Sequence, residues 1–172
     1  STETIGGHNN VTEPRHVLSF YSTSESTSTN EEKKERISQI SSGKEHNLVV
    51  TENGNVWSWG GNSCGQCGVG SDKPVSFPQR VQFPNHPETG EPNRVKIVGC
   101  GTYLTVFVTE SNDIYISGRF LDKTFTVPTK LNLESKHLIE RSPQDQSDDD
   151  FNSTTQNIDK LSVGNGFFMF TS

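Results

Sequence analysis

The segment GNSCGQC at 61–67 carries two patterns that could do chemistry. The first five residues satisfy G-x-S-x-G, the pattern in which hydrolases place a nucleophilic serine on a strained turn between a strand and a helix. No helix is expected here, because the glycines from Gly65 to Gly70 and the proline at Pro74 disfavour one. The segment is therefore predicted to be a loop and not a hydrolase site.

Cys64 and Cys67 form a C-x-x-C pair, the spacing that lets two thiolates hold one zinc ion or form a redox disulfide. A structural zinc needs four ligands, and only Cys100 and scattered histidines remain to complete the set. Three cysteines are also too few for a disulfide framework. We expect Cys67 to pack in the core, and we expect no metal and no cofactor.

Two further groups could be chemical but favour plainer roles. His46 could act as a general base, yet it begins an apolar strand and is predicted to be a buried structural histidine. The run Asp148–Asp150 could attract a cation, but adjacent like charges lack the ligand geometry of a calcium loop and indicate a solvated acidic linker. No catalytic residue is assigned, and the chain is not expected to be an enzyme by itself.

The composition narrows the classes of partner. A formal net charge of -6 and a pI near 5.3 disfavour nucleic acid and anionic membranes, since both are normally bound by clusters of Lys and Arg. No apolar run approaches the roughly 20 residues that cross a bilayer. The chain has no initiating Met and no visible secretory signal, so we expect it to begin inside a larger cytoplasmic and/or nuclear protein with reduced thiols.

Strand signals dominate the elements that must position these residues. Apolar residues alternate with period two in Leu48–Val50, Val56–Trp59 and Val106–Val108, which suits antiparallel strands and not helices. Asn53-Gly54 lies between two such runs and is typical of a tight hairpin turn. Only 28% of the chain is hydrophobic, and 22–36 and 134–156 are too polar to offset the entropy of ordering them.

The sequence also repeats internally. The segment 40–62 aligns with 98–120, which superposes Gly43 on Gly101 and Gly60 on Gly118. A third copy of the repeat begins at 161–172, where Gly164 aligns with Gly43 and Gly101. The segment 5–20 is similar to the end of a repeat. Short antiparallel strands repeating at this period indicate propeller blades, each of which needs neighbours to bury its faces.

The residues SSGKEHNLVVTENGNVWSWGGNSCGQCGVG (41–70), followed by Pro78 and Val81, resemble the regulator-of-chromosome-condensation repeat. The resemblance implies an all-β fold, a partial β-propeller with blades of four-stranded antiparallel sheet and with disordered inserts. The family's rings are usually seven-bladed, so this chain would supply a fragment of one. The residues predicted to carry the repeat structurally are Gly43, His46, Asn53, Gly54, Trp59, Gly60, Gly65, Gln66, Gly68, Gly101, Gly118 and Gly164.

The second repeat departs from the pattern, with Leu104 in the place of His46, Ser117 in the place of Trp59, and no Gly-Gln run after Phe120. We therefore expect it to form a degenerate blade. The predicted division of the chain is 1–21, tail of a preceding repeat; 22–36, low-complexity insert; 37–94, complete repeat; 95–133, degenerate repeat; 134–156, acidic disordered insert; and 157–172, start of a further repeat.

The resemblance implies a protein that binds a protein partner, a small GTPase or a complex subunit, as a scaffold or accessory regulatory factor. Two alternatives stay open: a guanine-nucleotide exchange factor for a small GTPase, and an enzyme. The stretch YISGRFLDKTF (115–125) is also similar to an alpha-tubulin-suppressor-like subgroup linked to tRNA wobble-uridine modification and diphthamide synthesis.

The loops 60–72 and 118–126 follow equivalent strands, so we expect them to emerge at equivalent blade corners and to contact a partner. Arg119, Phe120 and Lys123 are the predicted anchors, because basic and aromatic residues beside a strand end are typical of interface hot spots. The alternative is that they merely cap a degenerate blade.

Overall fold

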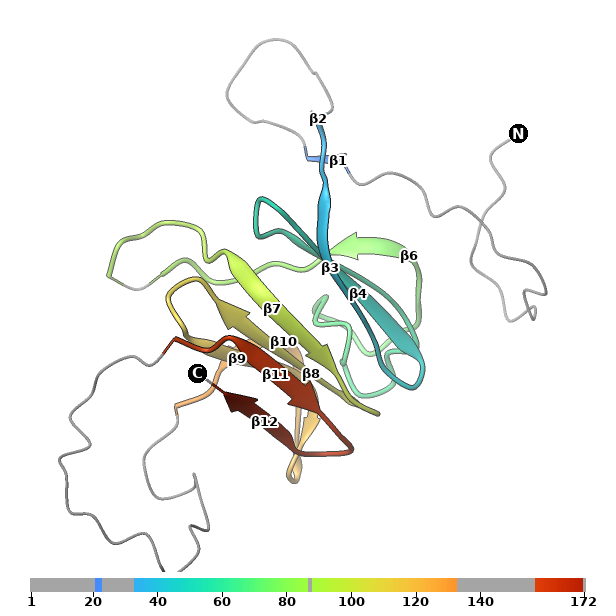
Figure 1. The fold of residues 1–172 in the computed structure, drawn as a ribbon. Helices are drawn as coiled ribbons and strands as arrows, with labels where there is room; N and C mark the ends of the chain where they lie inside the picture. Colours follow the sequence, from blue (N-terminus) through green and yellow to red (C-terminus); the bar gives the residue numbers. More distant parts are fainter. Residues whose placement is uncertain (1–20, 23–32, 87, 133–156, 172) are drawn as a thin grey trace, which may run out of the picture.

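The computed structural model describes residues 21–22, 33–86, 88–132 and 157–171, and these contain strands and no helix (Figure 1). No helix of the described ranges is therefore long and apolar enough to span a membrane. Two four-stranded antiparallel sheets follow one another along the chain. The predicted all-β fold is confirmed. The segments 1–20, 23–32 and 134–156, which include a predicted repeat tail and most of both predicted inserts, lie outside the described residues.

The first sheet is ordered β3 (Ile37–Ser42), β4 (His46–Thr51), β5 (Val56–Gly60) and β6 (Val75–Arg80). The turn between β4 and β5 forms where Asn53-Gly54 predicts it. The Gly54 N–H donates to the Thr51 carbonyl over 2.9 Å, and the Thr51 N–H donates to the Asn55 carbonyl over 2.9 Å. Gly54 has a φ of 74°, so a glycine occupies the left-handed position that closes this three-residue hairpin loop.

The second sheet repeats this order with β7 (Val95–Cys100), β8 (Leu104–Thr109), β9 (Ile114–Phe120) and β10 (Lys123–Lys130). Its β8–β9 turn has the same hydrogen bonds, but Asn112 with a φ of 64° replaces the glycine. The registers also agree, because His46 lies opposite Gly60 and Leu104 lies opposite Gly118. The two repeats therefore build the same type of blade.

Two short hairpins complete the described chain. β1 (Tyr21–Ser22) pairs with β2 (Lys33–Lys34), and β11 (Lys160–Val163) pairs with β12 (Phe168–Thr171). The first strands of the three successive sheets, β3, β7 and β11, contact one another in succession (Figure 1), and we call them the inner strands.

One glycine at the end of each inner strand sets how closely these strands approach. Gly43, Gly101 and Gly164 each donate the backbone N–H to the carbonyl of the residue three positions later, over 2.7–2.8 Å. A Cβ on Gly43 would overlap the carbonyl oxygen of Gly101, and a Cβ on Gly101 would overlap that of Gly164. Glycine is needed here because a backbone, and not a side chain, occupies the space.

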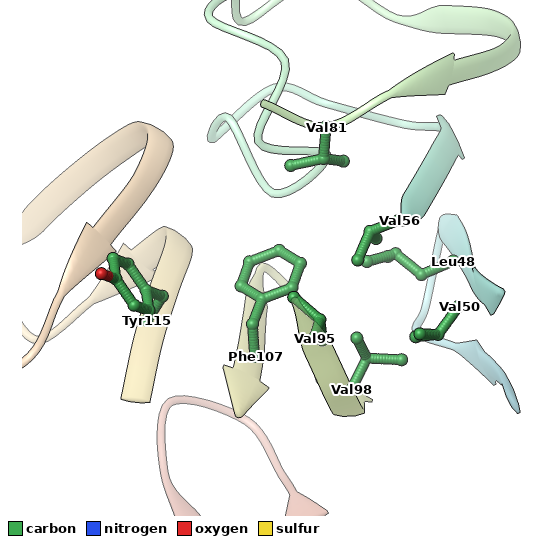
Figure 2. Close-up of a cluster of buried hydrophobic side chains, with 8 residues drawn as sticks. All are labelled: Leu48, Val50, Val56, Val81, Val95, Val98, Phe107 and Tyr115. Atoms are coloured by element: carbon green, nitrogen blue, oxygen red, sulfur yellow. The ribbon is translucent and has the colours of Figure 1, made fainter. Parts of the chain in front are cut away.

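The core lies between the sheets and not within one of them. The first cluster of buried side chains joins the two four-stranded sheets (Figure 2) and consists of Leu48, Val50, Val56, Val81, Val95, Val98, Phe107 and Tyr115. The second joins the β7–β10 sheet to the β11–β12 hairpin, with Phe168 and Phe170 packed on Leu104, Val106, Val108, Ile114 and Ile116. Each blade thus buries its faces only against its neighbours.

Candidate protein-binding surface

A buried polar network joins the first blade to the second. Nε2 of His46 lies 2.8 Å from Oγ1 of Thr105, and the Thr105 hydroxyl donates to the Gln66 carbonyl over 2.7 Å. Since Thr105 uses its hydrogen on Gln66, His46 donates through Nε2 and keeps Nδ1 unprotonated. Ser117 donates to the same Gln66 carbonyl over 3.1 Å. His46 therefore joins the first blade to the second through its hydrogen bond to Thr105.

The electrostatics of His46 agree with this assignment. Burial lowers the pKa of the His46 imidazole to about 4, because the charged form would lose its hydration. The side chain is 1% exposed and is neutral near pH 7. The imidazole is thus shielded from solvent.

The glycine-rich loop after β5 extends this junction. The Asn62 amide holds the loop in shape by donating to the carbonyls of Ser71 and Lys73 over 2.7 and 3.0 Å. Gly70 donates its N–H to the Thr126 carbonyl on β10 over 2.8 Å. At Gly65, with a φ of 73°, a Cβ would lie 2.7 Å from Cα of Thr126. Much of the predicted contact loop 60–72 therefore packs against the second blade.

The cysteines of the C-x-x-C pair do not share one environment. Cys67 is fully buried with its Sγ 3.7 Å from the Gly61 carbonyl oxygen, whereas Cys64 is half-buried. Burial raises the pKa of the Cys67 thiol, and burial also raises the pKa of Cys100 to about 11. Both thiols are protonated near neutral pH. Within the described ranges, no three His, Cys, Asp or Glu side chains gather as a metal site would require.

A second polar contact across the same junction was not predicted. The Gln39 side chain accepts from the Val98 N–H over 2.9 Å and donates to the Val98 carbonyl over 3.0 Å. The Gln39 side chain therefore bonds to the β7 backbone as a neighbouring strand would. Ser41 accepts from the Cys100 N–H over 3.1 Å beside it. A Gln among serines carries no sequence signal for this role, since the contact depends on where the next blade lies.

At the Gly60 and Phe120 ends of the strands, the two blades jointly present a basic aromatic group that we call the Tyr103 cluster: Lys44, Tyr103 and Arg119. The Arg119 guanidinium carbon lies 4.9 Å from the centre of the Tyr103 ring, and Nζ of Lys44 lies 5.7 Å from it. Both distances suit cation–π contacts. Arg119 is exposed, so this surface offers a positioned cation to solvent.

The structure places the other two predicted anchors differently. Phe120 is half-buried, and its ring centre lies 5.9 Å from that of Phe168 on the next hairpin. Lys123 begins β10 opposite Phe120 and is exposed. Phe120 thus packs between blades, while Arg119 and Lys123 are exposed.

Leu121, at the tip of the β9–β10 hairpin, is a residue that the sequence did not single out. It is 77% exposed and has a φ of 52°, a left-handed conformation that non-glycine residues rarely adopt. An apolar side chain held in solvent on a strained backbone is typical of a binding site. We call Leu121 together with the Tyr103 cluster and Lys123 the loop face.

Comparison with known proteins identifies the repeat. Two family models of the Regulator of chromosome condensation (RCC1) repeat match residues 37–66 and 53–108. The matched part of the chain, residues 37–108, is made of RCC1 repeats. The chain is 39% identical over 83 residues to the Ultraviolet-B receptor UVR8 of Arabidopsis thaliana, covering 48% of this chain and 18% of that protein. It is 35% identical over 79 residues to the X-linked retinitis pigmentosa GTPase regulator of Homo sapiens, covering 46% and 7%.

Solved structures share the fold. Human WBSCR16 matches with a TM-score of 0.53 at 18% identity, over 80% of this chain and 31% of that one. Yeast RCC1 (Prp20), solved bound to Kap60, matches with a TM-score of 0.52 at 22% identity, over 76% and 28%. The chain spans less than a third of these structures and less than a fifth of the two curated relatives above. The chain thus has the fold of part of a β-propeller.

Proposed function

We propose that this RCC1-repeat chain binds a protein partner, as a scaffold or accessory regulatory factor, and that the loop face is its contact surface. The observation that carries the proposal is Leu121, exposed and left-handed beside the Arg119–Tyr103 pair. Burying a leucine side chain in a partner contributes about 2 kcal/mol. Arginine and tyrosine are also over-represented among residues that dominate binding energy.

The partner we favour is a subunit of a larger complex in the cytoplasm or nucleus, with no direct contact to nucleic acid or membrane. The likeness of 115–125 to propellers linked to tRNA wobble-uridine modification and diphthamide synthesis suggests where to look for it. The overall charge of -6 supports a protein partner over nucleic acid.

The test uses the full-length protein in its own cells, with wild type and the double variant Leu121→Asn/Arg119→Ala compared by affinity recovery and quantitative mass spectrometry. Asparagine tolerates positive φ, so the hairpin is kept while its apolar side chain is removed. We expect a specific partner to be recovered at least tenfold less with the variant. Phe77→Asn, at an exposed apolar residue of β6, is the matched control. Equal recovery with both variants and wild type would remove the loop face from the proposal.

The alternative is a guanine-nucleotide exchange factor for a small GTPase. It draws support from a relative named as a GTPase regulator and from the likeness to yeast Prp20p, a protein with binding properties to Gsp1p and histones. Release of a fluorescent GDP analogue from a panel of small GTPases separates the two functions. Strong acceleration favours the exchange factor, whereas stable recovery of complex subunits without acceleration favours the scaffold.

A further inference from the structure

A cleft of about 790 Å³ lies at the opposite ends of the strands from the loop face. The β4–β5 turn at 53–56 and the β8–β9 turn at 110–111 form two of its walls, and the stretches 80–86 and 89–94 between the blades form the rest. We call it the turn-side cleft. Both blades contribute to it, so it exists only because they are joined.

The floor of the cleft is apolar and fixed in place. Val56 and Val81 line it and belong to the core between the blades. The Phe83 ring stands edge-on to Phe107 and Tyr115, with ring centres 5.1 and 5.8 Å apart. Edge-to-face packing of this kind holds an aromatic ring rigidly. The floor therefore offers a preformed contact for an apolar side chain.

Arg80 supplies a cation at the rim. Its guanidinium donates to the Asn55 amide oxygen over 2.6 Å, and Asn55 in turn donates to the buried Glu35 carboxylate over 2.6 Å. Arg80 is in none of the ion pairs formed among the described residues, which join Lys44 to Glu45, Lys73 to Asp72, Arg94 to Glu110 and Lys130 to Asp113. The guanidinium is thus held in position with donors left for a ligand.

The remaining charges of the lining limit where an anion can bind. Nε of Arg94 lies 3.4 Å from the Glu110 carboxylate, so this pair is internally compensated. Glu91, on the connection, repels an anion near it. A ligand carboxylate therefore binds best at Arg80, since a guanidinium can donate two parallel hydrogen bonds to a carboxylate.

Amide side chains complete the rim. Asn93 is held by donating to the Pro84 carbonyl over 2.6 Å and to the Tyr115 hydroxyl over 3.1 Å. Asn53 and Gln82 also line the cleft, and their side chains make no hydrogen bond to another described residue. An amide offers a donor and an acceptor together, which matches the alternating groups of an extended peptide backbone.

We propose that the turn-side cleft binds an extended peptide segment in which a carboxylate side chain neighbours an apolar one. The carboxylate pairs with Arg80, the apolar side chain rests on Phe83, and the amide rim binds the peptide backbone. This site is separate from the loop face, so the protein holds two binding surfaces at opposite ends of its strands.

The test selects a phage-displayed library of random dodecapeptides on the full-length protein. We expect enriched peptides to share Asp or Glu beside Leu, Ile, Phe or Val. The synthetic consensus peptide should bind Arg80→Gln at least tenfold more weakly than wild type, and its Asp→Asn version should bind wild type with a similar loss. Arg80→Lys, which keeps the charge, should retain part of the affinity, and Leu121→Asn should retain all of it.

Thermal melting confirms that each variant is folded before binding is compared. The proposal is overturned if no peptide is enriched, if enriched peptides lack a carboxylate, or if the consensus binds Arg80→Gln as tightly as wild type. Loss of binding with Leu121→Asn, and not with Arg80→Gln, would assign the selected peptides to the loop face and also overturn it.

Discussion

The two junctions between successive repeats share one backbone frame and each contains an apolar cluster, but two equivalent positions are polar at the first junction and apolar at the second. At the first junction His46 and Gln39 make polar contacts to the second blade. The equivalent positions at the second junction hold Leu104 and Ile97, which pack with phenylalanines of β12 in an apolar cluster. The inner glycines and their backbone hydrogen bonds are the same at both.

The difference shows which part of the repeat is essential to the frame. A buried N–H is costly without an acceptor, so the Nε2–H of His46 needs the Thr105 hydroxyl, which the Gln66 carbonyl orients. An apolar junction needs only matched volume. The second repeat has neither the histidine nor the Gly-Gln run, and it keeps the glycines that admit backbone contacts.

The largest effect is expected at a glycine of the shared frame. Gly118 has a φ of 92°, and a Cβ there would overlap the Tyr103 carbonyl oxygen, so Gly118→Val should cost more than about 3 kcal/mol. Gly60→Val should have a similar cost, because a Cβ there would overlap the Glu45 carbonyl oxygen. Urea unfolding measures both. Gly90→Ala is the control, with a φ of 70° and no atom within 4 Å of its Cβ; equal losses would show that backbone contact is not the cause.

Exchanging the residues of the two junctions tests this difference between them. Leu104→His should destabilise by about 3 kcal/mol, because it buries an imidazole in the apolar cluster without a partner. His46→Leu should cost only about 1–2 kcal/mol, since it removes one hydrogen bond and keeps the volume. The free energy of unfolding in urea gives both values. A larger loss for His46→Leu would contradict the comparison.

The polar junction should also be sensitive to pH. Burial lowers the pKa of folded His46 from 6.5 to about 4, so the unfolded chain takes up a proton first as pH falls. The contribution of His46 to the free energy of unfolding is complete above pH 6.5. It decreases by up to about 3 kcal/mol as the pH falls toward 4. Urea midpoints between pH 7 and pH 4 should therefore fall more steeply for wild type than for His46→Leu. Parallel slopes would remove the imidazole as the cause.

A smaller effect is expected at the β8–β9 turn, where Asn112 stands in the place that Gly54 has in the first blade. Asn112 accepts from Nζ of Lys96 over 2.6 Å and from the Ile158 N–H over 3.1 Å, contacts that Gly54 cannot make. Asn112→Gly keeps the left-handed backbone and should cost about 1 kcal/mol. If the stability is unchanged, the contacts of the Asn112 side chain with Lys96 and Ile158 do not stabilise the fold.

The smallest effect is expected at Cys64, which is half-buried at the first junction. Cys64→Ser should change the free energy of unfolding by less than about 0.5 kcal/mol. Metal analysis of the purified protein accompanies the melting curve. If the wild-type protein holds one zinc ion per chain, and Cys64→Ser loses both the zinc and stability, the C-x-x-C pair is a metal site.

Much of the frame could be predicted because its signals are local. Alternating apolar residues, the Asn53-Gly54 turn and the glycine register indicated two equivalent antiparallel blades, and the structure has them. The candidate surface was harder to predict. Phe120 has the residue type of an interface anchor, yet it packs on Phe168, and Leu121 gave no signal because its strain comes from a two-residue hairpin turn.

The strands, their turns and the turn glycines could be predicted from the sequence, since each depends on the preferences of a few neighbouring residues. The pairs of polar groups that meet could not be predicted, because the packing of one blade on the next brings them together. Gln39 reaches Val98, and His46 reaches Thr105, across 59 residues of sequence. These contacts, the loop face and the turn-side cleft all depend on the distance and rotation between blades, and packing across the shared core sets both.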